Sequence, residues 1–88
     1  MNNALTSAQI RAARALLKWS AADLANRSLI GVATIRRAEL SEAETSMTTA
    51  NDLAVRRALE DGGVQFIDEN GGGPGVRLRD RTPPDPKR

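Results

Sequence analysis

Residues 20–39 read SAADLANRSLIGVATIRRAE, and the rest of the chain is arranged around this stretch. Ser20 is a favourable N-cap for a helix, and Asp23, three residues later, can accept hydrogen bonds from the open backbone N–H groups, as in a capping box. A short helix should therefore start here and end before a connection formed by residues 29–31. A second helix is expected over residues 32–40.

The second of these helices has two contrasting faces. At roughly 100° per residue, Ile35 shares one face with Ala38 and Glu39. The opposite side carries small and cationic side chains, which are Ala33 and Arg37 with Thr34 and Arg36 beside them. One face can therefore be buried against other helices while the other meets a partner. Two short helices joined in this way are typical of a helix-turn-helix, whose second helix enters the major groove of DNA.

The same stretch and its surroundings resemble a known family. The matching residues are Leu16-Leu17, Trp19-Ser20, Leu24-Ala25 and the run Ala33 to Arg37, closing at Glu39. Their joint spacing is similar to the Cro/C1-type (XRE-like) helix-turn-helix family, which includes the lambdoid phage repressors. The resemblance covers about residues 5–61. It implies a four-helix, lambda-repressor-like domain from a small regulator of bacterial, phage or mobile-element origin.

Two positions depart from the family pattern. Leu29 stands where a turn glycine is usual, and leucine tolerates a positive φ poorly. Ala21 stands where a base-reading glutamine is common, so one expected DNA contact is missing.

Arg14 is expected to lie at the edge of the first helix's apolar stripe, one turn after Ile10. An unpaired cation is costly in such a place. The resemblance implies that Arg14 forms a structural ion pair with Glu39 at the end of the second helix of the motif. The alternative is a solvated arginine near the DNA backbone, and we favour the ion pair.

Composition limits the classes of function. The chain has 88 residues and no cysteine or histidine, which excludes disulfides, zinc fingers and catalysis by Cys or His nucleophiles. Its net charge is only +2, but residues 1–38 hold six basic residues and one acidic residue, hence +5, whereas residues 39–44 hold three glutamates. The half that carries the motif is therefore basic. No apolar run approaches 18 residues, so we expect a cytoplasmic protein without membrane contact.

Two further helices complete the expected domain. Thr6 and Gln9 have the spacing of a capping box for a helix from Ser7 to about Lys18. Trp19 is interpreted as a core residue. Thr49, with Asp52 three residues later, is interpreted as the N-cap of a last helix that stops at Gly62-Gly63. The helix-turn-helix domain is therefore expected to span residues 5–61.

Beyond Gly63 the apolar period changes to two, and the segment DENGGGPG interrupts it, which predicts a β-hairpin over residues 62–79. We expect this hairpin to support dimerisation through apolar residues that include one from the last helix, namely Leu59, Val64, Phe66, Val76 and Leu78. Whether it packs within one subunit or across a dimer interface is open at this stage. Residues 80–88 contain three prolines and no apolar anchor, which predicts a disordered tail.

These patterns predict a sequence-specific, duplex-DNA-binding transcriptional regulator, a homodimeric repressor. The predicted base-reading residues are Val32, Ala33 and Arg37, and the predicted phosphate contacts are Ser20, Thr34 and Arg36. The alternative is a protein-binding module, an antitoxin or antiactivator that masks a partner protein. No nucleophile–base arrangement is evident, so we expect no enzyme activity, metal, cofactor or small-molecule substrate.

Overall fold

The computed structural model describes residues 5–80 of the chain, and these residues form four α-helices followed by an antiparallel hairpin. The elements are α1 (Ser7–Leu17), α2 (Ala21–Ser28), α3 (Val32–Glu39), α4 (Thr49–Gly62), β1 (Val64–Ile67) and β2 (Gly75–Leu78). The predicted mainly helical fold with a C-terminal hairpin is confirmed at this level. The predicted tail lies outside the described residues except for Asp80.

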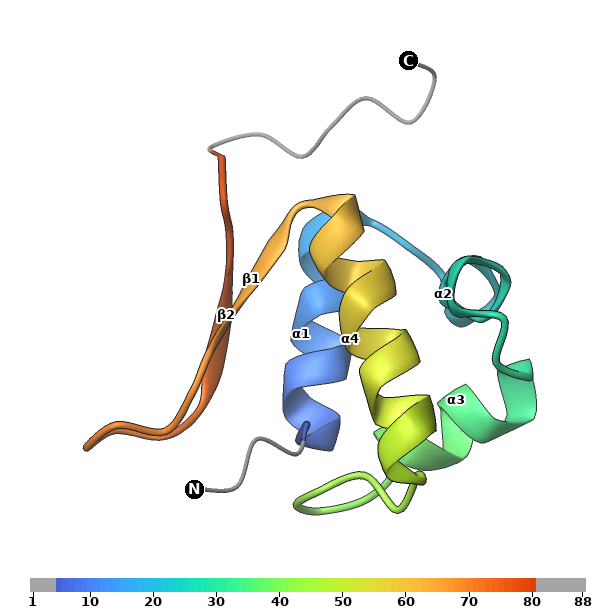
Figure 1. The fold of residues 1–88 in the computed structure, drawn as a ribbon, viewed down its shortest axis with the longest axis horizontal. Coiled ribbons are helices and arrows are strands. Elements are labelled where there is room, and N and C mark those ends of the chain that lie inside the picture. Colours follow the sequence, from blue (N-terminus) through green and yellow to red (C-terminus); the bar gives the residue numbers. More distant parts are fainter. Residues whose placement is uncertain (1–4, 81–88) are drawn as a thin grey trace.

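The elements form layers around a central pair of helices (Figure 1). In that view α1 and α4 lie side by side, with the hairpin on one side of them and α2 and α3 on the other. The strands pack on this pair, β2 mainly against α1 and β1 mainly against α4. On the other side, α2 packs on α4 and on α3, and α3 also contacts α1. The hairpin and α3 therefore occupy opposite sides of the subunit.

Apolar side chains from every helix and from β1 meet in one core. Its fully buried members include Ile10 and Ala13 of α1, Leu24 of α2 and Ile35 of α3. The apolar stripe expected along α1 is therefore confirmed, because Leu17 is buried as well. Removal of these side chains from water is the main stabilising contribution to such a small domain.

Helix ends follow the local sequence, with one exception. The capping boxes expected at Thr6 and Ser20 are both present. For α4 the sequence-based prediction is wrong by one residue, because the N-cap is Thr48, whose hydroxyl accepts from the Asn51 N–H at 3.1 Å. The carboxylate of Asp52 instead accepts a hydrogen bond from the Thr45 hydroxyl at 2.5 Å.

The hairpin packs against the helices of the same chain. Val64 pairs with Leu78, and Phe66 pairs with Val76, so that these four side chains share the face that covers the helices. Leu59, Val64 and Phe66 are 0%, 1% and 8% exposed. The side chains of these three are therefore covered by the chain's own core, and the dimerisation role expected for them stays a prediction. Val76 and Leu78 are only partly buried.

No helix among residues 5–80 is long and apolar enough to cross a membrane.

Candidate nucleic-acid interface

The two faces of α3 differ as the angular pattern predicts. Ile35 and Ala38 are 0% and 1% exposed, and Glu39 is buried beside them. The residues on the outward side are exposed, and they are Ala33, Arg36 and Arg37. Val32 and Thr34 lie between these faces and are half-buried. The described surface of α3 thus brings together five of the six residues that were expected to meet DNA.

The connection between α2 and α3 begins with a backbone exception. Leu29 has φ 60° and ψ 31°, which is the left-handed conformation that glycine usually supplies. This conformation lets the N–H of Ile30 reach back to the carbonyl oxygen of Ala25 at 3.2 Å and close α2. Gly31 then becomes the N-cap of α3, which has no side-chain cap. No capping side chain therefore accepts a hydrogen bond from the first N–H groups of α3.

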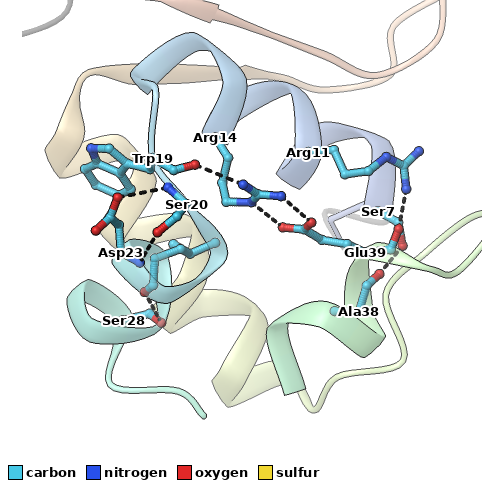
Figure 2. A network of polar contacts seen from close by, with 10 residues as sticks. Ser7, Arg11, Arg14, Trp19, Ser20, Asp23, Ser28, Ala38 and Glu39 are labelled. Atoms are coloured by element: carbon cyan, nitrogen blue, oxygen red, sulfur yellow. Dashed lines mark hydrogen bonds and ion pairs between the residues drawn. The ribbon is translucent and has the colours of Figure 1, made fainter. Parts of the chain in front are cut away.

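An ion pair fixes the other end of α3. Nε of Arg14 donates to Oε2 of Glu39 at 2.6 Å, and Nη2 of Arg14 donates to Oε1 at 2.7 Å. The third guanidinium nitrogen donates to the carbonyl oxygen of Trp19 at 2.9 Å (Figure 2). The hydrogen bonds with Glu39 raise the pKa of the Arg14 guanidinium, although its partial burial acts in the opposite direction. The structure therefore contains the pair that the family resemblance implied.

Two further residues of α1 hold the same end of α3. The hydroxyl of Ser7 donates to the carbonyl oxygen of Ala38, and the guanidinium of Arg11 donates to the carbonyl oxygen of Glu39. Figure 2 shows both side chains directed at the last turn of α3. These bonds satisfy carbonyl groups that have no partner within a helix. Together with Arg14 they define an α1 clamp, made of Ser7, Arg11 and Arg14.

Ser20 occupies a different environment from the α3 residues. It is exposed at the start of α2, where its hydroxyl accepts from the Asp23 N–H at 3.0 Å and its own N–H donates to Asp23 Oδ2 at 2.9 Å. The backbone hydrogen bond from Ser20 is the main cause that lowers the pKa of Asp23. An ionised carboxylate therefore already occupies the N-terminus of α2. The hydroxyl hydrogen is the Ser20 group that remains available for a phosphate, and the phosphate contact stays a prediction.

The charges near α3 favour a polyanion. Glu39 is neutralised by Arg14, so the exposed charges of α3 itself are those of Arg36 and Arg37. The other nearby acids, Glu42 and Glu44, lie beyond the end of α3 on the loop that leads to α4. Residues 5–80 contain no group of three or more acidic side chains placed to hold a metal ion.

Trp19 lies at the connection between α1 and α2, away from the end of α3 (Figure 2). It is half-buried and packs against the core. The guanidinium carbon of Arg27 lies 4.7 Å from the centre of its ring, a cation–π geometry. The interpretation of Trp19 as a packing residue agrees with this placement.

A comparison of the chain with models of known protein families finds no match, and a comparison with curated proteins also finds none.

Proposed function

We propose that the protein is a sequence-specific, duplex-DNA-binding transcriptional regulator of the Cro/C1-type (XRE-like) family, which acts as a homodimeric repressor. The observation that carries this proposal is the state of α3. One of its faces is buried, its last turn is held by the α1 clamp, and its opposite face presents only small and cationic side chains. A helix that is held in place and exposes short and basic side chains suits the major groove of DNA.

The arrangement of α2 and α3 supports a helix-turn-helix. The two helices have eight residues each, are separated by Leu29 to Gly31, and pack against each other. In this arrangement the second helix enters the groove and the first lies across the backbone. The exposed residues near the start of α3 then face the bases.

Each exposed residue of α3 has a proposed role. Arg37 suits guanine, because its planar fork can donate to O6 and N7 together. Ala33 is small enough to let the helix approach the groove floor, and Val32 can contact a thymine methyl group. Arg36 and Thr34 lie to either side and suit phosphates on the groove walls, with the hydroxyl of Ser20 as a further donor.

The proposed biological action is repression by occupancy. A chain that blocks a promoter needs only a DNA-reading surface and a second copy, so that two α3 helices meet two half-sites. The exposed face of α3 would supply one such surface on each subunit.

A masking module, an antitoxin or antiactivator, is the second candidate. The observation that favours it is the exposure of large apolar side chains at Leu29, Leu40 and Leu53, which are 90%, 81% and 55% exposed. Isolated exposed leucines are common on monomers. The DNA proposal is therefore preferred, and the masking role is an outcome of the test below.

Selection from random duplex DNA, followed by affinity measurements on the selected site over a salt series, tests the proposal. We expect one preferred sequence and a log–log salt slope of several units, because each phosphate contact releases counterions. Equal binding to all duplexes would contradict sequence-specific recognition. A chain that binds no duplex at low salt would favour the masking role.

A further inference from the structure

Leu29 combines a strained backbone conformation with an exposed apolar side chain. Its φ of 60° lies in the left-handed region, where the Cβ of any residue other than glycine is crowded by the backbone. Its side chain is 90% exposed, more than that of any other large apolar residue described. Lys18 is the only other non-glycine residue with a positive φ between residues 5 and 80, and it carries a polar side chain that suits solvent.

Neither packing nor turn geometry explains a leucine here. A side chain this exposed contributes almost nothing to the core. The turn itself would form with less strain if the residue were glycine, since glycine adopts positive φ without a steric cost. Residues with a strained backbone conformation that neither packing nor turn geometry requires tend to lie at functional sites.

The position of Leu29 indicates what its side chain can contact. It lies three residues before α3, at the start of a run in which the exposed positions Leu29, Gly31 and Ala33 alternate along the sequence with half-buried ones. A Cβ built at Gly31 would meet no atom within 4 Å, so the space around Gly31, two residues after Leu29, is open. This run carries no charge, and Leu29 is the largest apolar group on it.

We infer that Leu29 is a specificity-determining contact, whose isobutyl group packs on the methyl group of a thymine at the edge of the major groove. This inference rests on the proposed function, because it places Leu29 beside the groove that α3 enters. The thymine methyl is the apolar group that a base pair presents in the major groove. An exposed leucine on a charge-free run next to the reading helix complements that group.

The first test exploits opposite effects on stability and binding. Replacement of Leu29 by glycine removes the left-handed strain and should raise the Tm by about 4–8 °C. The same Leu29→Gly change should weaken binding to the selected duplex roughly five- to twentyfold, because the apolar contact is lost. The salt slope should stay unchanged, since no charge is removed. Leu29→Asn, which keeps a Cβ and tolerates positive φ, should lose affinity in the same way.

The second test removes the methyl group from the DNA instead. Each thymine of the selected half-site is replaced in turn by uracil, which lacks only that methyl. For the wild type, uracil at one position should lower the affinity several-fold relative to thymine. Leu29→Gly should bind the thymine and uracil duplexes of that position with equal affinity. Such a pattern assigns the contact to this side chain and not to altered flexibility of the turn.

Two variants serve as controls. Leu53→Gln removes another exposed leucine, from α4, and should leave affinity unchanged. Lys18→Gly relieves the same left-handed strain at the end of α1 and should raise the Tm without changing the response to uracil. Leu29→Gly that binds as tightly as the wild type would overturn this inference and leave the proposed function standing. A wild type that binds no duplex would overturn both.

Discussion

The guanidinium of Arg14 makes three hydrogen bonds at once, two to the carboxylate of Glu39 and one to the carbonyl oxygen of Trp19. The side chains are 23% and 9% exposed, so both charges are largely removed from water. Removal of one partner leaves the other charge buried without compensation, which is far more costly than removal of both.

Arg14→Met should therefore lower the free energy of unfolding by on the order of 3 kcal/mol, at the low end of the range for buried pairs because Arg14 is partly exposed. The double variant Arg14→Met with Glu39→Leu should recover much of this loss. Denaturant unfolding of the wild type, both single variants and the double variant measures the coupling. Additive losses would show that the pair contributes nothing beyond its separate side chains.

Gly62 is required for a close approach between α4 and Trp19. A Cβ at this position would lie 2.7 Å from the ring atoms Cη2 and Cζ2 of Trp19 and 2.9 Å from Cδ1 of Leu17. Neither a ring nor a packed leucine can move freely to make room.

Gly62→Ala should destabilise the domain by about 1–3 kcal/mol, as overpacking does, even though alanine is the better helix former. Gly72→Ala is the matched control, because a Cβ there meets nothing within 4 Å. Thermal unfolding of both variants and of the wild type measures the difference in stability. A Gly62→Ala variant as stable as the wild type would mean that Trp19 can shift.

Residue-level features differed in how far the sequence could predict them. The inward face of α3 followed from helical periodicity alone. The Arg14–Glu39 pair came from the family resemblance, because no periodic pattern links residues so far apart. The other two members of the α1 clamp, Ser7 and Arg11, were missed, since both bind backbone carbonyls and such bonds leave no complementary residue in the sequence. Their spacing from Arg14, which places all three on one side of α1, was the available signal.

At the level of elements, the hairpin behaves as part of the core. A two-stranded hairpin is marginal in water by itself and needs a surface to cover. Here Val64 and Phe66 complete the core above α1 and α4, and the guanidinium of Arg56 lies 5.1 Å from the centre of the Phe66 ring. The hairpin should therefore unfold together with the helices.

Phe66→Asp tests this role. Loss of the buried ring costs about 3–5 kcal/mol, and a buried carboxylate costs more, so the whole domain should unfold or melt far below the wild type. Gln65→Asp places the same side chain on the exposed face of the same strand and should retain the fold. The measurement is the helical circular dichroism signal. A helical Phe66→Asp monomer would show that the hairpin only joins subunits.

The boundaries of the helices and strands could largely be predicted from the sequence, because capping residues and hydrophobic periodicity are local properties. The exception, the start of α4, has a simple cause. Thr48 and Thr49 are adjacent, and each has a polar residue three positions later, so the sequence offers two equivalent caps. The sequence could not predict that the hairpin is buried within its own chain. An apolar strand face has the same sequence pattern whether helices of the same chain or a second subunit cover it.

At the scale of the whole molecule, dimerisation needs a surface that the core does not use. The hairpin register, with the Arg79 N–H donating to the carbonyl oxygen of Gly63, directs the backbone groups of Val76 and Leu78 to the outer edge of β2. In this register these groups form no ladder hydrogen bond with β1. A second β2 can pair with this edge about a two-fold axis, which would place Arg77 opposite the partner's Arg77.

We therefore expect sedimentation to show a dimer at high micromolar concentration, and added salt to strengthen it by screening the two arginines. Val76→Pro removes an N–H of the open edge but none that holds the hairpin together, and it should yield folded monomers. A wild type that stays monomeric would contradict the homodimer, and a Val76→Pro dimer would place the interface elsewhere.

A dimer that reads two half-sites one turn apart must hold its two reading helices roughly 34 Å apart on one face of a duplex. The proposed homodimer would have to place its two α3 helices at this spacing. The central claim is that α3 reads this duplex with Arg37 and is held on it by Arg36.

The most direct test compares Arg37→Ala and Arg36→Ala on the selected site, on single-base variants of it and over a salt series. Arg37→Ala should lose about 1–3 kcal/mol of discrimination at one guanine in each half-site. Arg36→Ala should weaken binding to all sequences alike and reduce the salt slope by about one per subunit. Arg57→Ala, an exposed arginine of α4, is the control and should change neither. If neither α3 variant changed DNA affinity at low salt, the claim that α3 reads DNA would be wrong.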